Sequence, residues 1–185
     1  MPNWCLNWGF ITVAASHAEE VKAAIEEARF LNYIAPAPED DVNWQRQNWG
    51  TKWEIDLLKV SVVEEDNEKV KLDVSFQTAW CPPHEAFQKL WEMEHIHDIE
   101  MYAEEGGDCY CCYWKNGETE EFHDYEAPED DTEDDDKQFE HYLEWVYEKL
   151  GQDLRTQESK EAANKEKLRE TCLLYTSDAA DERHC

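Results

Sequence analysis

The order in which strand-like and helix-like patterns alternate is the feature that most constrains this fold. A mixture of β-branched and aromatic residues from Leu6, LNWGFITVAA, predicts a first strand. A helix follows, opened by a capping box of Ser16 and Glu19. Its apolar residues recur at helical spacing, and they are Val21, Ala24, Ile25 and Ala28. The loop APAPEDD, residues 35–41, ends this pattern because two prolines and an acidic cluster break a helix.

Two extended runs and a second helix continue the alternation. Residues 53–63 and 70–79 flank the polar segment EEDNEK, which is typical of a hairpin with a longer connection. Pro82 and Pro83 then open a helix whose apolar face holds Phe87, Leu90 and Trp91. A fourth strand is expected at residues 98–103. The order β-α-β-β-α-β fits a ferredoxin-like sandwich, in which one antiparallel sheet carries its helices on one face.

An extra hairpin and a C-terminal helix complete the predicted fold. Asn116 and Gly117 suit a type I′ turn between CYCCYWK and ETEEFHDY, because both turn positions require a positive φ. An apolar stripe predicts a later helix, at Phe139, Tyr142, Leu143, Val146 and Leu150. The predicted class is therefore α+β: a ferredoxin-like antiparallel sheet with helices on one face, an extra β-hairpin and a C-terminal helix.

The charge of the chain limits the partners it can bind. The formal net charge is −28, from 17 Lys plus Arg against 45 Asp plus Glu. Direct binding to nucleic acid is disfavoured, because affinity for the phosphate backbone comes from cationic side chains. A partner protein with a basic surface is more compatible with this charge, and that surface can be the one with which the partner binds nucleic acid.

The same patterns predict how the chain is organised. We expect the sandwich over residues 1–126, an acidic linker over 127–136 and a C-terminal helical segment over 137–171. No apolar run approaches the ~20 residues that span a bilayer, so no membrane association is expected. The start MPNWCLNWGF lacks the features of a secretion signal. We therefore expect a cytoplasmic protein whose seven Cys are free thiols, and no oligomeric state is favoured.

Three separated motifs carry a resemblance to a known family. They are MPNWCLN at the start, NWGTKW from Asn48 and FQTAWCPP from Phe76. In this order they resemble the YubB-type ferredoxin-like proteins of phages and plasmids, over roughly residues 1–116. The resemblance implies a ferredoxin-like fold and a mobile-element origin, and it implies no activity and no catalytic positions. The acidic residues 118–136 and the Cys-rich CYCC lie outside the resemblance.

A tetrahedral zinc site is one interpretation of the Cys and His residues. Cys81 and His84 followed by Cys109 and Cys112 give C-x2-H and C-x2-C spacings. Cys109 and Cys112 are an odd number of residues apart, so a strand would send them to opposite faces. Free thiols are therefore the favoured interpretation, with no cofactor. No nucleophile with a base, phosphate loop or inward carboxylate pair stands out, which disfavours an enzyme.

The aromatic residues of the motifs allow a structural and a functional interpretation. Trp49 and Trp53 flank a Gly that permits a tight turn. Burial of both indoles against Trp4 or Trp80 would pin the loop to the sheet, and this is the favoured interpretation. The alternative is an aromatic groove for a peptide or a base, formed by Trp4, Trp49, Trp53 and Trp80.

Two functions from different classes remain. The favoured one is a non-enzymatic phage or plasmid accessory protein that binds a host protein with a basic surface, as an acidic nucleic-acid mimic acting against host defence. Its candidate residues are Glu118, Glu120, Glu121, Asp130, Asp131, Asp134, Asp135 and Asp136. The alternative is a small zinc-dependent module or enzyme that uses the Cys/His set.

The segment from Cys172, CLLYTSDAADE, resembles a translated transposase sequencing adapter. We expect residues 172–185 to be an artefact of metagenomic assembly and exclude them from the fold. Their deletion should leave the thermal unfolding midpoint unchanged within error, because a segment without a selected sequence makes no specific contacts. A fall of several degrees would show that the segment belongs to the fold.

Overall fold

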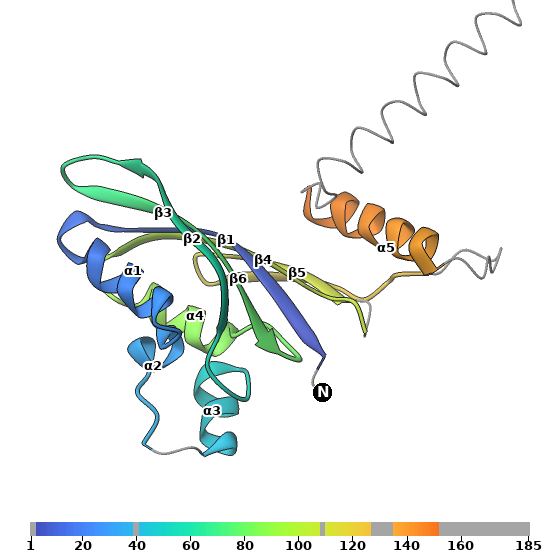
Figure 1. Cartoon of the computed structure of the whole chain (residues 1–185), viewed down its shortest axis with the longest axis horizontal. Coiled ribbons are helices and arrows are strands. Elements are labelled where there is room, and N and C mark those ends of the chain that lie inside the picture. The colour runs from blue at the N-terminus through green and yellow to red at the C-terminus, as the bar shows by residue number, and fades with distance from the viewer. Residues whose placement is uncertain (1–2, 39–40, 108–109, 127–134, 152–185) are drawn as a thin grey trace, which may run out of the picture.

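Six strands form one antiparallel sheet in the order β2-β3-β1-β4-β5-β6. The computed structural model describes residues 3–38, 41–107, 110–126 and 135–151 (Figure 1). The strands are β1 (Trp4–Ala14), β2 (Asp56–Glu65), β3 (Lys69–Ala79), β4 (Ile96–Glu105), β5 (Tyr110–Lys115) and β6 (Glu118–Phe122). The first four strands and the helices between them have the ferredoxin-like order, and β5 and β6 form the extra hairpin, which confirms the predicted α+β fold.

Helices cover both faces of the sheet. A short 3-10 turn, η1 (Ala15–His17), leads into the helices of one face, which are α1 (Ala18–Glu26), α2 (Phe30–Ile34), α3 (Val42–Trp49) and α4 (His84–Trp91). The added helix α5 (Asp135–Leu150) lies on the opposite face (Figure 1). Among the described residues, no helix combines the length and apolar character needed to cross a membrane.

Two hydrophobic clusters correspond to these two layers. Ile11 and Val13 of β1 belong to the larger cluster, together with buried residues of α1, α2 and α4. Trp8 of the same strand packs against the smaller cluster, which includes Tyr142 and Val146 of α5. Successive side chains of a strand point to opposite faces, so β1 supplies both cores.

The start of α1 differs from its prediction. Ser16 does not cap the helix: it lies in η1, and its hydroxyl oxygen is 3.0 Å from Nδ1 of His17. The N-cap position is His17, which makes no side-chain capping hydrogen bond. The capping box is therefore wrong, because a 3-10 turn between β1 and α1 moves the helix start past Ser16.

Helix α3 was not predicted, and it changes the meaning of the NWGTKW motif. Asp41 begins the helix, since its Oδ1 accepts hydrogen bonds from the backbone N–H groups of Asn43 and Trp44 at 2.9 and 3.1 Å. Gly50 ends it with a φ of +85°, the left-handed conformation that favours glycine at a helix C-terminus. The motif is thus a helix end, and β2 starts at Asp56 rather than at Trp53.

Trp49 of the motif and Glu54 just after it connect this segment to α2 and to the residue that follows α2. Trp49 is 3% exposed, and its Nε1 donates a 2.8 Å hydrogen bond to the carbonyl of Ala35. Its ring packs edge-on against Trp44, in place of the expected contact with Trp4 or Trp80. The Glu54 carboxylate accepts hydrogen bonds from the first backbone N–H groups of α2, those of Leu31 and Asn32, at 2.6 and 2.9 Å.

Trp49 and Trp53 should therefore differ in their contribution to stability. We expect Trp49→Ala to lower the free energy of unfolding by about 3–5 kcal/mol, because it removes a buried indole and its hydrogen bond. Trp53 is exposed, and Trp53→Ala should cost about 1 kcal/mol or less. Urea denaturation of both variants measures the difference. Equal losses would mean that Trp49 is not the anchor of this segment.

Candidate binding pocket

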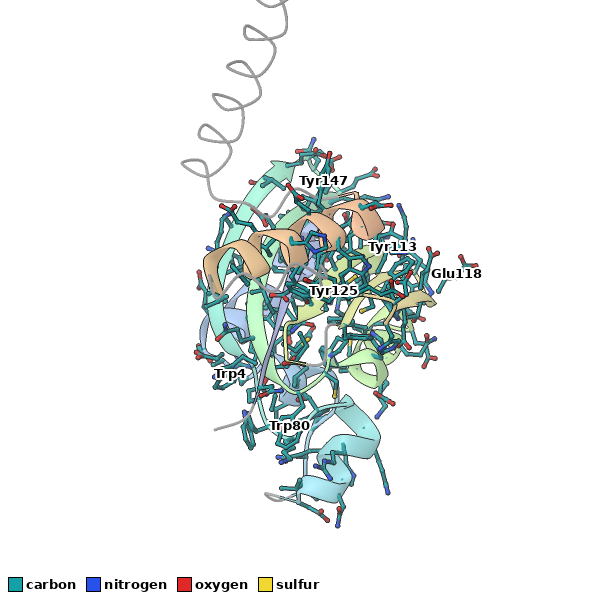
Figure 2. All side chains as sticks on the ribbon, turned by 90° about the vertical axis from the view of Figure 1, so that its right-hand side faces the viewer. Trp4, Trp80, Tyr113, Glu118, Tyr125 and Tyr147 are labelled. Atoms are coloured by element: carbon teal, nitrogen blue, oxygen red, sulfur yellow. The ribbon has the colours of Figure 1, made fainter. Side chains whose placement is uncertain are left out.

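The three sequence motifs meet at one end of the sheet. In the ladder of β1 and β3, Trp4 lies opposite Ala79. The backbone N–H of Trp80 donates to the carbonyl of Asn3 at 2.9 Å, and the thiol of Cys81 donates to the carbonyl of Gly50 at 2.9 Å. Figure 2 shows Trp4 and Trp80 at the same end of the molecule. Segments far apart in the sequence therefore build one region.

A pocket of about 630 Å³ opens in this region. Its walls come from the C-terminal end of α3, the loop after β3, the start of α4 and the strands β4, β5 and β6. The lining residues are Gly50, Trp80, Cys81, Pro82, His84, Glu85, Glu105, Tyr110, Glu121 and His123. Two of the three motifs thus contribute directly to its walls.

The pocket carries negative charge. The carboxylates of Glu85, Glu105 and Glu121 line it, and no Lys or Arg is among its described lining residues. Glu105 is only 2% exposed, and its Oε1 accepts a hydrogen bond from the backbone N–H of Gly107 at 3.0 Å. Burial lowers the pKa of His84, although Glu121 and Glu85 act in the opposite direction. Burial therefore makes the His84 ring a weaker source of positive charge in the pocket than an exposed imidazole.

Three side chains lie near the carboxylate of Glu121. Nδ1 of His84 lies 3.6 Å from one carboxylate oxygen, and the hydroxyl of Tyr110 donates to the same oxygen at 3.4 Å. Nε2 of His123 lies 4.0 Å from the other oxygen. On its far side, Nε2 of His84 lies 3.4 Å from Sγ of Cys112. A chain of polar contacts therefore runs from the buried strand β5 to the edge strand β6.

The thiol in this chain is protonated. Burial is the main cause that raises the pKa of Cys112 to about 12, and the Glu121 carboxylate acts in the same direction. Cys112 is 1% exposed. A nucleophilic cysteine needs an accessible thiolate. The arrangement of Cys112 and His84 thus differs from an activated thiolate–imidazole pair.

The structure brings together part of the predicted zinc set. Cys81 and His84 line the pocket, and Cys112 contacts His84, whereas Cys109 lies outside the described residues. Among the residues that the structure describes, no three His, Cys, Asp or Glu side chains are grouped closely enough to hold a metal ion.

The predicted aromatic and acidic residues do not each form one group. Trp4, Trp53 and Trp80 are exposed, whereas Trp49 is buried in the core. Glu118, Glu120 and Glu121 are exposed on β6. Asp130, Asp131 and Asp134 lie outside the described residues, and Asp135 and Asp136 are described only as the backbone of the first turn of α5.

Six lining residues were not among the candidate site residues predicted from the sequence: Gly50, Pro82, Glu85, Glu105, Tyr110 and His123. A signal for some of them was present in the Asn116-Gly117 turn. This turn fixes the register of β5 and β6, which places Cys112 opposite Glu121. The pairing of β4 with β5 places Tyr110 opposite Glu105. Side chains two residues apart share a face, so Tyr110 and Cys112 belong together.

Comparison with known proteins agrees with this fold. Residues 60–143 match the family model described as the ferredoxin-like domain in Api92-like protein. The match begins within β2 and ends within α5, so it includes every lining residue except Gly50. It also includes the CYCC segment and the acidic residues 118–136, which lie outside the motif resemblance. Searches of the curated proteins and of the solved structures found no match.

Thiol labelling should distinguish the Cys residues of this region. With iodoacetamide at neutral pH, we expect Cys81 to be modified in the folded protein because it is accessible, but more slowly than a free thiol, since desolvation and Glu85 raise its pKa. Cys5, Cys111 and Cys112 are buried and should react only after unfolding, since burial raises the pKa of each thiol. Peptide mass spectrometry reads the sites. Rapid modification of Cys112 in the folded protein would contradict the protonated, inaccessible thiol and favour Cys/His chemistry.

Proposed function

We propose that this protein is a non-enzymatic accessory protein of a phage or plasmid that binds a host protein through a basic surface of that partner. The observation that carries the proposal is the acidic edge strand β6. Glu118, Glu120 and Glu121 are exposed on it, and Figure 2 shows Glu118 at the periphery of the molecule. Glu121 of the same strand lines the acidic pocket, and because strand side chains alternate it faces the side of the sheet opposite to Glu118 and Glu120, so β6 carries carboxylates on both faces.

The two edges of the sheet differ in what they can accept. The ladder between β2 and β3 shifts register twice, between Leu57 and Lys59 and between Val62 and Glu64. Such bulges protect an edge against pairing with another strand. The β5–β6 ladder runs without a shift, so β6 presents a regular edge. Its carboxylates disfavour a second copy of the same acidic strand and favour a basic segment.

The mobile-element origin and the location in the host cytoplasm rest on the motif resemblance. The extension to nucleic-acid mimicry against host defence rests on charge: an acidic surface suits a site that normally binds phosphates. The alternative function, a zinc module or enzyme, draws on the 3.4 Å contact between His84 and Cys112. Zinc content of the purified protein separates the two, since only the alternative requires a stoichiometric metal.

The proposal predicts that loss of two edge carboxylates weakens partner binding. Glu118→Gln with Glu120→Gln should reduce the amount of basic host protein captured from lysate, because the variant removes two negative charges from the edge strand. Both side chains are exposed, so the variant should still fold. Capture by the wild type should also fall at high salt, since exposed charges are screened over ~8 Å at physiological ionic strength. Mass spectrometry identifies and quantifies the captured proteins.

A matched variant controls for net charge. Glu19→Gln with Glu20→Gln makes the same charge change on the exposed surface of α1, and it should leave capture unchanged. Thermal unfolding checks that both variants fold. Equal capture by wild type, edge variant and control, at low and high salt, would contradict the proposed function.

A further inference from the structure

We infer that the pocket between α4 and the β5–β6 hairpin binds an arginine side chain of the partner, an inference that rests on the proposed function for its biological context. The pocket is lined by carboxylates from α4, β4 and β6, namely Glu85, Glu105 and Glu121. The three carboxylates come from different elements, so they add negative charge to more than one wall of the pocket.

An aromatic wall adds a second feature that suits a cation. Trp80 lines the pocket and is 51% exposed. Nζ of Lys52 lies 4.2 Å from the centroid of its ring. This contact shows the kind of ligand that the indole accepts, and because Lys52 takes one face, a ligand cation would use the opposite face. Tyr110 contributes a second ring to the lining, and its hydroxyl donates to Glu121.

The backbone of Trp80 adopts a strained conformation that is stabilised by its neighbours. Its φ is +78°, a left-handed conformation that is rare for a bulky residue. The hydrogen bond from its N–H to the carbonyl of Asn3 and the anchoring of Cys81 on Gly50 fix the chain on either side. The indole is thus presented at the pocket by its neighbours in the fold.

A guanidinium fits these walls better than an ammonium. It is planar and stacks on an aromatic ring, and its fixed fork of N–H donors matches carboxylate oxygens. An ammonium is a compact, strongly hydrated charge that loses more hydration on entry. The Glu121 carboxylate already accepts a hydrogen bond from the Tyr110 hydroxyl at 3.4 Å, and its remaining lone pairs are open to a ligand donor.

Short peptides test the inference without the unknown partner. The probe is a fluorescent glycine-rich peptide with one central arginine, compared by anisotropy with peptides that carry citrulline or lysine at that position. Citrulline keeps the planar shape and lacks the charge. We expect the full-length protein to bind the arginine peptide about tenfold more tightly than the citrulline peptide, with lysine between them. Equal binding of the arginine and citrulline peptides would overturn the inference.

Variants place the binding in the pocket. Glu85→Gln should weaken arginine-peptide binding about three- to tenfold, whereas Glu92→Gln, an exposed residue at the other end of α4, should have no effect. Trp80→Gly should weaken it similarly, and glycine accepts a φ of +78° without strain, so the variant should fold. Thermal unfolding verifies this. Unchanged affinity in both folded pocket variants would also overturn the inference.

The two proposals fail in different ways. If the edge variant loses host-protein capture while arginine and citrulline peptides bind alike, the proposed function stands and the arginine pocket is wrong. If the pocket discriminates the peptides while the edge variant captures host protein as well as the wild type does, the arginine site stands and the proposed function is wrong.

Discussion

The central position of β1 is the constraint on which the rest of the structure depends. This strand pairs with β3 on one side and β4 on the other. A Cβ at Gly9 would lie 2.0 Å from the carbonyl oxygen of Glu100, so only glycine permits this close approach to β4. With β1 fixed, alternation along the strand sends Ile11 to the core under α1–α4 and Trp8 to the core under α5.

The pocket follows from the same geometry. The start of β1 is polar on the α4 side, where buried Asn7 donates from Nδ2 to the carbonyl of Cys5 and to the hydroxyl of Thr78. Thr78 in turn donates to the carbonyl of Cys81. At the start of β1 and the end of β3, the apolar core is therefore replaced by buried hydrogen-bonded groups. The carboxylates of the pocket lie beyond them, which places charge beside a rigid sheet rather than on a mobile loop.

Local patterns predicted the fold, and long-range packing decided what they missed. The strand order and the β5–β6 hairpin could be predicted because alternation and the Asn116-Gly117 turn act over a few residues. The contacts of Trp49 could not be predicted, because they depend on helix α3. This helix places the indole against Trp44 and within hydrogen-bond distance of the Ala35 carbonyl. The acidic pocket escaped prediction for the same reason, since Glu85 and Glu105 meet only after the sheet and α4 have assembled.

Nuclear Overhauser contacts between the protein and the bound arginine peptide test the central claim most directly, because they locate the ligand atom by atom. We expect contacts from the guanidinium and adjacent methylene protons to the ring protons of Trp80 and Tyr110. Contacts confined to another surface, such as the exposed apolar side chains of β2, would contradict it.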